Sequence, residues 1–571
     1  MFKARVPYAP TTGGTHDTNE RILYFVVENN DGSAVNVKTS SFFSPMPGDL
    51  TSLTRERVTK IAGPRKQLIL TFVNHVRLDF ARTWVAHVRR LSLTNWLVGA
   101  TDEGALQGLM RERTPCFSMK TNLPQGEWDW GSPNFKALGL HKVALIHTAL
   151  TWGVAIVITD IDALVLREPF GYMERWPDAS FLTTSDHLGN TTGSRDGGLE
   201  DHGATSSAFN IGYMYFNISA LPLVKVWRDA MFARNRWDQG EFNSLVRSGM
   251  RLQRDEERLA DPRLFRCFGG HVVGGVLPLA LFAGGHHHFV SAMAHRLGVQ
   301  PYSVHTTFQY GGAPGKRHRL REGMLWEEAD EGYYAPAGGV LAYDADVPDR
   351  LLRPKGGMTA KGHIELMLHQ LRQLRVALAL SYALGRVLVL PQLACGFDKY
   401  WAPIGAHGMI PSAPSWAAPI GGPNGTHGCP LDHLLNPAEL KPEPTRYVRE
   451  YSFLQNPKLH IEFAPSTAFR TAVQLASGSS EMRRLREASS KKVLWITNLP
   501  MIADALWQQG EPYRKARDAE GGMHEARRGL LLAPRTWRGF KRTFARLQGG
   551  WCCAPTGQSP RAAGFHVMNS V

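Results

Sequence analysis

The sequence predicts an α/β fold with a mostly parallel sheet, followed by a second α/β domain. Segments with the apolar pattern of strands alternate with segments that carry a helical apolar stripe. The strand segments are almost continuously apolar, as in a parallel sheet that helices cover on both faces. The chain has 571 residues, which is enough for several domains.

The composition indicates a folded protein of the size of an enzyme. Apolar residues make up 43% and charged residues 20% of the chain, which argues against a wholly disordered protein. The formal net charge of +15 favours polyanionic partners, either nucleic acid or small phosphorylated ligands, without distinguishing them. The six cysteines include no C-x-x-C pair and are too few for a disulfide scaffold.

No segment has the features of a membrane helix or of a signal peptide. The best apolar run, Val272 to Gly285, is rich in glycine and shorter than the roughly 18 residues that a membrane span requires. The first residues, Met1 to Tyr8, lack the apolar core of a signal peptide.

We predict the first domain at residues 61–345, after an extension at 1–60 that contains one possible strand, Ile22 to Val27. The helix expected at 76–91 carries Phe80 and Trp84 on one face. The other predicted helices are 102–111, 134–151 and 239–247. The predicted strands are 67–73, 96–99, 115–118, 154–159, 179–184 and 208–217.

We predict the second domain at residues 346–571. A helical stripe within 363–385 precedes a strand at 387–390, which is another αβ unit, and a further strand is expected at 493–496. Four arginines at helical spacing within 535–546 are typical of a solvated basic surface. The sequence of this domain shows no cluster of metal ligands, so we expect it to support the first domain or to recognise a substrate.

The residues with the clearest chemical meaning follow the strand at 154–159. Asp160 and Asp162 form a D-x-D pair at the carboxyl end of this strand, where ligands bind in open α/β sheets. At the mouth of a strand, the backbone of such a pair can bend so that both carboxylates converge on one hard cation, Mg²⁺ or Mn²⁺, and such ions usually bridge substrate phosphates. A solvated turn is the alternative, and the flanking strands favour the metal site.

Two enzyme classes place such a pair after a strand. Phosphatases of the haloacid type use the first Asp as the nucleophile, near the start of their domain, and have Thr or Val two residues after the second Asp. Here Leu164 occupies that position, and three βα units come first. Metal-dependent glycosyltransferases place the pair after several βα units of a nucleotide-binding half, so this class fits better.

A series of short motifs then narrows the class. They are Asp79–Phe80, Thr83–Val85, Trp96–Ala100, Asp160–Asp162, Thr184–Asp186, Asn210–Gly212, Trp237–Gln239, Val304–Tyr310, Gly315–Glu322, Cys429–His433, Arg449–Leu454 and Trp551–Cys553. Because these motifs occur in this order, residues 68–322 and 357–553 resemble the extensin arabinosyltransferases of plants and green algae, which belong to glycosyltransferase family 77.

This resemblance implies a type A glycosyltransferase fold, a UDP-sugar donor and Mn²⁺ or Mg²⁺. It also implies a retaining enzyme that adds β-1,2-linked arabinofuranose to short arabinosides on the hydroxyproline of extensin-type, hydroxyproline-rich cell-wall glycoproteins. The family acts in the Golgi lumen and carries an N-terminal membrane anchor. No anchor is visible in this sequence, as in a truncated gene model or a fragment.

By this resemblance, Asp160 and Asp162 hold the metal against the diphosphate, and His305 completes the metal shell. Neutral imidazole is a competent metal ligand. Lys316 follows His305 eleven residues later, like the His…Lys pair of other retaining type A enzymes. A packed or surface histidine is the alternative for His305, and the cluster His286–His288 is a rival source of a ligand.

Three residues are candidates for binding the nucleotide. Lys316, together with the metal, neutralises the charge that develops on the phosphates as UDP leaves. Lys142 lies on the helix before the D-x-D strand and is a second phosphate candidate, with an ordinary surface lysine as the alternative. Asn74 follows the first strand of the domain and is either a nucleotide ligand or a turn residue.

The sugar-binding residues are predicted to be Asp186, Asn210, Asp238 and Gln239. Retention requires a carboxylate nucleophile or attack from the leaving-group side within an ion pair, and the sequence does not choose between them. We expect Asp186, Asp238 and Gln239 to line the sugar, stabilise its cation-like centre and hold the acceptor. Asp238 also fits the N-cap of the helix at 239–247, which is compatible with that role.

Other functions are open at the level of sequence. The same chemistry with UDP-xylose or UDP-galactose is a close variant. A non-catalytic glycan-binding relative is disfavoured by the intact set of Asp160, Asp162, His305 and Lys316. Only the net charge suggests a nucleic-acid binder; because no motif of interleaved aromatic and basic residues supports it, we expect no nucleic-acid partner.

Overall fold

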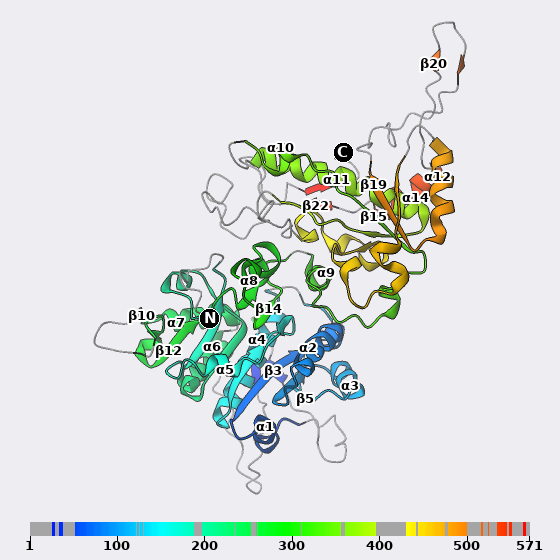
Figure 1. Ribbon diagram of the computed structural model, residues 1–571. Coiled ribbons are helices and arrows are strands. Elements are labelled where there is room, and N and C mark those ends of the chain that lie inside the picture. Colours follow the sequence, from blue (N-terminus) through cyan, green and yellow to red (C-terminus); the bar gives the residue numbers. More distant parts are fainter. Residues whose placement is uncertain are drawn as a thin grey trace. The chain divides into compact units, whose positions relative to one another are not determined.

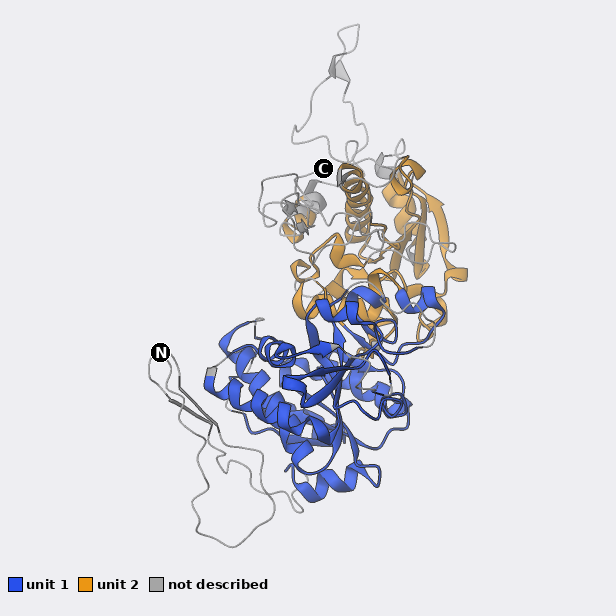
Figure 2. Ribbon diagram, turned by 90° about the vertical axis from the view of Figure 1, so that its left-hand side faces the viewer, with its two compact units in different colours: residues 1–288, 293–305 blue, residues 289–292, 306–571 orange. Residues whose placement is uncertain are grey.

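Figure 1 shows the computed structural model of the chain, and Figure 2 shows its two compact units. The first unit comprises residues 1–288 and 293–305, and the second comprises residues 289–292 and 306–571. The residues that the structure describes are 25–28, 34–37, 52–121, 123–124, 126–128, 131–187, 197–234, 236–252, 259, 261–309, 311–355, 360–395, 430–440, 444–473, 478–499, 516–517, 523–524, 534–544, 548–550 and 564–566.

The first unit is built on a nine-stranded sheet in the order β10-β11-β12-β8-β9-β6-β3-β4-β5. Its strands are β3 (Gln67–Val73), β4 (Trp96–Ala100), β5 (Cys116–Ser118), β6 (Ala155–Thr159), β8 (Phe181–Ser185), β9 (Phe209–Phe216), β10 (Arg251–Leu252), β11 (Phe265–Cys267) and β12 (Val272–Val276). Strands β3 to β6 are parallel to one another, whereas β9 runs antiparallel between β6 and β8. The sheet is therefore mostly parallel, with two reversed strands, β9 beside β6 and β11 near the other edge.

The first unit also contains a series of helices (Figure 1). They are α1 (Arg55–Ala62), α2 (Leu78–Arg90), α3 (Glu103–Arg111), α4 (Pro133–Thr151), α5 (Phe170–Met173), α6 (Leu221–Arg234), α7 (Asp238–Arg247) and α8 (Met293–Leu297). Every residue of β3, β4 and β9 is buried, as expected for strands that are covered on both faces. Asp102 and Ser132 cap α3 and α4, because each side chain accepts a bond from the backbone three residues later.

A second, three-stranded sheet in this unit has the order β13-β14-β7. Its strands are β7 (Ala163–Val165), β13 (Phe282–Gly284) and β14 (Ser303–His305). Strand β14 is antiparallel to β7, with His305 opposite Ala163. This pairing places the end of β14 beside the turn that leaves β6.

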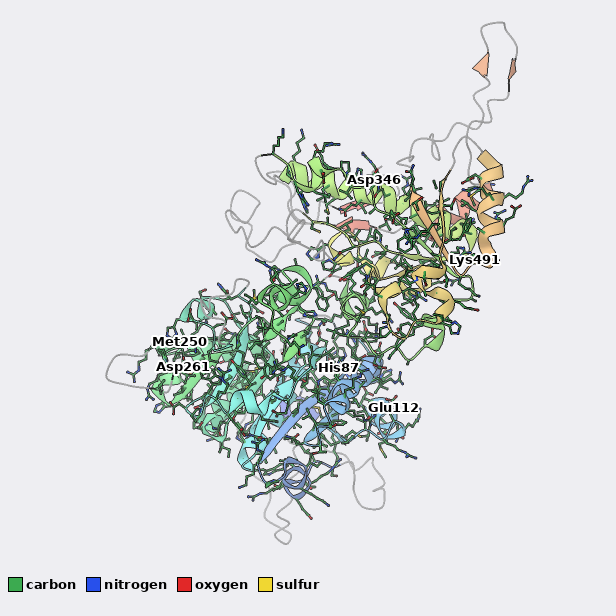
Figure 3. The ribbon with its side chains drawn as sticks, viewed as in Figure 1. His87, Glu112, Met250, Asp261, Asp346 and Lys491 are labelled. Carbon is green, nitrogen blue, oxygen red and sulfur yellow. The ribbon has the colours of Figure 1, made fainter. Side chains whose placement is uncertain are left out.

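The second unit contains a wholly parallel five-stranded sheet in the order β17-β16-β15-β19-β18. Its strands are β15 (Val340–Tyr343), β16 (Val387–Val389), β17 (Val448–Arg449), β18 (Phe469–Ala472) and β19 (Val493–Asn498). Its helices are α9 (Gly312–Glu322), α10 (Asp349–Leu352), α11 (Ala360–Leu384), α12 (Gly478–Glu487) and α14 (Pro534–Thr543). His369 and Gln373 of α11 both donate to the carbonyl of Asp346, which follows β15 and is labelled in Figure 3.

Three antiparallel strand pairs complete the described elements. They are β1 (Phe25–Glu28) with β2 (Ala34–Val37), β20 (Ala516–Arg517) with β21 (Met523–His524), and β22 (Gln548–Gly550) with β23 (Gly564–His566). None of the helices within the described ranges has the length and apolar character that crossing a membrane requires.

The predicted fold class is confirmed: each unit holds an α/β sheet, and the first sheet is mostly parallel. The predicted strand at 67–73 and helix at 134–151 match β3 and α4 to within one residue. Helix α1 starts at Arg55, inside the predicted extension, and the sequence pattern missed it because only Val58 and Ala62 are buried. The division between the two compact units falls at residue 305, whereas our domain boundary lies at residue 345.

Candidate functional site

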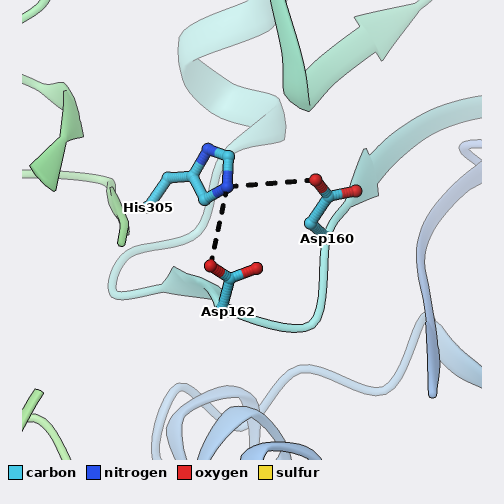
Figure 4. Close-up of side chains that lie close together, drawn as sticks. All are labelled: Asp160, Asp162 and His305. Carbon is cyan, nitrogen blue, oxygen red and sulfur yellow. Dashed lines mark ion pairs between the residues drawn. The ribbon is translucent and has the colours of Figure 1, made fainter. Parts of the chain in front are cut away.

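The two aspartates of the D-x-D pair lie in a turn between β6 and β7. The backbone N–H of Asp160 donates to the carbonyl of Gly212 in β9, and the N–H of Ala163 donates back to the carbonyl of Asp160. This tight turn ends the buried strand and lets both carboxylates leave the sheet on the same side, as Figure 4 shows. The carboxyl end of β6 therefore holds two acidic groups, as the sequence predicts.

His305 reaches these carboxylates through the β14–β7 pairing, which sets it opposite the residue that follows Asp162. Its Nε2 atom lies 3.9 Å from Asp160 Oδ2 and 3.8 Å from Asp162 Oδ2 (Figure 4). One ligand atom from each of the three residues lies within 4.8 Å of the others. Within the part of the chain that the structure describes, no other group of histidines, cysteines and acidic residues meets this criterion.

The donor set fits a divalent cation. Two ligands at about 2.1 Å from one ion are at most about 4.2 Å apart, and the separations of 3.8 and 3.9 Å between His305 and the two carboxylates lie within that limit. Carboxylates suit Mg²⁺ and Mn²⁺, and neutral imidazole is a common ligand of divalent transition metals, so this set of two carboxylates and one imidazole is compatible with a divalent cation. Asp162 and His305 are buried, and Asp160 is partly exposed.

Lys142 is buried behind Asp160. Its Nζ atom donates to Asp160 Oδ1 at 2.6 Å and to the carbonyl of Ile211 at 2.7 Å. The side chain comes from α4, and the residue is only 2% exposed, so the alternative of an ordinary surface lysine is wrong. Because Lys142 binds one carboxylate oxygen, the other oxygen of Asp160 is turned toward His305.

The predicted sugar-binding residues form a second polar cluster. Asn210 Nδ2 donates to Asp186 Oδ1 at 2.8 Å, and Gln239 Nε2 donates to Asp186 Oδ2 at 3.0 Å. Burial raises the pKa of Asp186, while these two hydrogen bonds and the nearby His305 oppose the rise. The cluster is connected to the candidate metal ligands through Gly212, whose N–H donates to Asn210 Oδ1 and whose carbonyl accepts from the N–H of Asp160.

Asp238 lies at the base of the same region. It is 7% exposed, and burial raises its pKa to about 6, with Lys142 opposing the rise. The predicted N-cap role is corrected. Helix α7 begins at Asp238 itself, its N-cap is Trp237, and Asp238 Oδ1 accepts from the next backbone N–H, that of Gln239. The carboxylate packs against α4, where a Cβ atom on Gly139 would lie 2.7 Å from it.

The remaining candidates have different surroundings. Asn74 directly follows β3 and donates from Nδ2 to the carbonyl of Gly126 at 2.8 Å, so it braces a loop beside the carboxyl end of the sheet. Lys316 lies on α9 in the second unit, and its contact with the diphosphate stays a prediction. Within the rival histidine cluster, His287 bonds to the backbone of Gly284 and of His187, which agrees with the alternative of a hydrogen-bonded loop.

Sequence reasoning missed the residues that support this site without carrying its chemistry. Gly212 has no Cβ where the ring of His305 packs, and Gly139 has none where Asp238 packs. Thr183 of β8 donates to the carbonyl of Asn210 at 2.7 Å. Gly212 belongs to the Asn210–Gly212 motif, which is the only signal in the sequence that pointed to it.

Residues 91–320 match the family model described as nucleotide-diphospho-sugar transferase. Together with the mostly parallel sheet and the acidic pair at the end of β6, this match shows that the chain carries a glycosyltransferase domain of the type A fold.

The resemblance to plant arabinosyltransferases is also confirmed. The chain is 38% identical over 402 residues to arabinosyltransferase XEG113 of Arabidopsis thaliana, and the match covers 69% of this chain and 60% of that protein. It is 25% identical over 149 residues to β-arabinofuranosyltransferase RAY1 of the same plant, which covers 26% of this chain and 27% of that protein. The chain therefore spans less than two thirds of the length of these relatives.

A solved structure, that of a glycosyltransferase involved in the glycosylation of the major capsid of PBCV-1, matches 44% of this chain and 98% of that chain, with 12% identity and a TM-score of 0.25. Because this TM-score is low, the fold assignment rests on the sheet order and the family match.

Proposed function

We propose that this protein is a retaining, metal-dependent arabinosyltransferase that uses UDP-arabinofuranose as its donor. The names of the two Arabidopsis relatives support the choice of sugar. The observation that carries the proposal is the convergence of Asp160, Asp162 and His305 at the carboxyl end of β6. This is the edge of an α/β sheet at which phosphate-bearing ligands bind.

Asp160, Asp162 and His305 hold Mn²⁺ or Mg²⁺ in this proposal. The bound ion supplies the positive charge that stabilises the diphosphate as UDP departs. Lys142 fixes Asp160 in the orientation that faces His305. Lys316 is proposed to meet the leaving phosphate and Asn74 to contact the nucleotide.

We propose attack from the leaving-group side, without a covalent intermediate on Asp186 or Asp238. Both oxygens of Asp186 already accept from side-chain amides, and an ionised carboxylate has about four acceptor sites, so it retains capacity for sugar hydroxyls. Asp238 is buried against α4 and is shielded from attack on a sugar. We therefore propose that Asp186, Asn210 and Gln239 orient the donor sugar, with Asp238 behind them.

The proposed acceptor is a short arabinoside on the hydroxyproline of an extensin-type glycoprotein, and the proposed location is the Golgi lumen. The name of XEG113 states no acceptor, so the support for this acceptor class comes from the resemblance of the chain to the extensin arabinosyltransferase family. Cys395 is disulfide-bonded, which suits an oxidising compartment of the secretory pathway.

The test is UDP release from a panel of UDP-sugars, with Mn²⁺ and hydroxyproline-arabinoside peptides, for the wild type, Asp162→Asn and the control Asp229→Asn. Asp229 is a carboxylate on α6 that pairs with its neighbour Arg228, so its removal changes the charge equally without touching the site. We expect acceptor-dependent release from UDP-arabinofuranose that Asp162→Asn alone abolishes. A preference for UDP-xylose or UDP-galactose would overturn the proposed sugar, and equal release by Asp162→Asn would overturn the proposed site.

A further inference from the structure

Strand β9 departs from regular pairing beside the candidate metal ligands. Thr183 of β8 lies opposite Met214, but the next residue, Thr184, lies opposite Asn210. Residues 211–213 of β9 therefore have no opposite residue on β8, which makes this segment a β-bulge. Bulges often occur next to active sites, where they redirect side chains and backbone groups.

The bulge directs three consecutive carbonyls toward different parts of the site. The carbonyl of Asn210 accepts from Thr183 Oγ1 at 2.7 Å and from Thr184 Oγ1 at 3.2 Å. The carbonyl of Ile211 accepts from Lys142 Nζ, and the carbonyl of Gly212 accepts from the N–H of Asp160 at 2.8 Å. The backbone of this segment thus holds both Asp160 and the lysine that binds Asp160.

The side chain of Asn210 connects the bulge to the second polar cluster. Its Oδ1 atom accepts from the N–H of Gly212 at 2.9 Å, and its Nδ2 atom donates to Asp186. The two bonds use opposite ends of one amide, so the shape of the bulge and the orientation of Asp186 depend on the same side chain.

Gly212 determines where His305 lies. A Cβ atom on Gly212 would lie 2.0 Å from Cε1 and 2.5 Å from Nδ1 of the His305 ring, closer than real side chains approach. The imidazole therefore packs directly on the backbone of β9, and its Nε2 atom is left facing Asp160 and Asp162. Any larger residue at 212 must push the ring out of this position.

We propose that the segment Asn210–Gly212, at the start of this bulge, is the element that assembles the site, and that Gly212 is a positioning residue for His305. One three-residue segment holds Asp160, Lys142, Asp186 and His305 by separate contacts. The expected effect of Gly212 on metal affinity, through the position of His305, rests on the proposed function. The packing of His305 on Gly212 does not depend on that function. The two claims are therefore tested by different measurements.

The packing is tested by thermal unfolding of the full chain in EDTA. Gly212→Ala is expected to lower the unfolding midpoint, and adding His305→Ala to it is expected to raise the midpoint again, because the overlap is gone. The control is Gly275→Ala in β12, where a Cβ atom would meet the side chains of three leucines and no imidazole. Adding His305→Ala to Gly275→Ala should give no recovery. Equal effects of His305→Ala in both backgrounds would overturn the inference.

The consequence for metal binding is tested by titrating Mn²⁺ into the same variants. Outer-shell substitutions in metal sites reduce affinity by about 10–100-fold, and we expect a loss of this size for Gly212→Ala but not for Gly275→Ala. His305→Ala alone should also weaken Mn²⁺ binding. The affinity of the double variant for Mn²⁺ should be little lower than that of whichever single variant binds Mn²⁺ less tightly. A loss for His305→Ala without one for Gly212→Ala would overturn the positioning role. No loss for His305→Ala would instead contradict the proposed metal site, and the midpoints in EDTA would still decide the packing claim.

Discussion

At the scale of single residues, Lys142 shows how an apolar helix can carry a charged group. It lies among buried positions of α4, and its ammonium is satisfied by Asp160 and the carbonyl of Ile211. A buried ion pair is costly to break, because removing one partner leaves the other charge without compensation. Lys142 is therefore both a structural residue and a determinant of how Asp160 is oriented.

Replacing Lys142 with methionine is expected to lower the free energy of unfolding by about 1–3 kcal/mol, since the Ile211 carbonyl and Asp160 would lose their partner while water can still reach the partly exposed Asp160. Calorimetry of the full chain in EDTA measures the loss. Lys225→Met is the matched control, because Lys225 is an exposed lysine on α6. If both variants had the same midpoint, the buried ion pair would contribute nothing measurable.

At the scale of elements, α4 and α7 meet at a glycine. Gly139 of α4 leaves room for the carboxylate of Asp238 at the first position of α7, and a Cβ atom there would lie 2.9 Å from the Cβ atom of Asp238. The indole N–H of Trp227 in α6 donates to the carbonyl of Asp238 at 3.1 Å. Three helices are thus joined at one residue, which keeps Gln239 beside Asp186.

Burial raises the pKa of Asp238 from 3.8 to about 6, and this predicts a pH-dependent stability. Asp238 keeps its proton to a higher pH in the folded protein than in the unfolded chain. Its contribution to the free energy of unfolding is therefore lost as the pH rises from about 4 to about 6. The rise corresponds to about 3 kcal/mol.

Asp238→Asn removes this titration. In EDTA, the difference in unfolding free energy between Asp238→Asn and the wild type should therefore shift in favour of the variant between pH 4.5 and pH 7. Denaturation curves across that range provide the measurement. A difference that stays constant with pH would contradict the elevated pKa.

At the scale of the whole molecule, motifs that are far apart in the sequence meet in the second unit. Arg319 of α9 donates from Nε to Asp432 Oδ1 at 3.1 Å, and the N–H of Leu431 donates to Glu322 at 2.9 Å. Farther along the chain, Ser452 Oγ donates to the carbonyl of Arg321 at 3.2 Å. The described residues of these three motifs, 315–322, 430–433 and 449–454, are thus linked by hydrogen bonds.

One pair among these contacts is Arg319 with Asp432, whose side chains are each 1% exposed. Arg319→Met leaves the carboxylate buried without its cation and is expected to cost about 3–5 kcal/mol of unfolding free energy. Chemical denaturation of the full chain measures it, with Arg350→Met on the surface of α10 as the control. A loss no larger than that of the control would show that the pair is not important for stability.

Local patterns predicted the elements, and contacts between distant segments explain what they missed. The apolar run of β3 and the stripe of α2, with Phe80 and Trp84, are encoded in neighbouring residues, and the D-x-D pair stands at the end of a recognisable strand. Residues distant in sequence pair through β14 and β7, and that register places His305 at the aspartates. The burial of Lys142 and the bulge in β9 also arise from tertiary packing, which no periodicity within one segment reveals.

The most direct test of the proposed centre is isothermal titration of UDP in the presence and absence of Mn²⁺, with wild-type protein and Asp162→Asn. The geometry of Asp160, Asp162 and His305 predicts tight UDP binding by the wild type only when Mn²⁺ is present, and a loss of at least about tenfold in Asp162→Asn. Binding of UDP with equal affinity in EDTA, or by Asp162→Asn with Mn²⁺, would contradict a metal centre that holds the diphosphate at the end of β6.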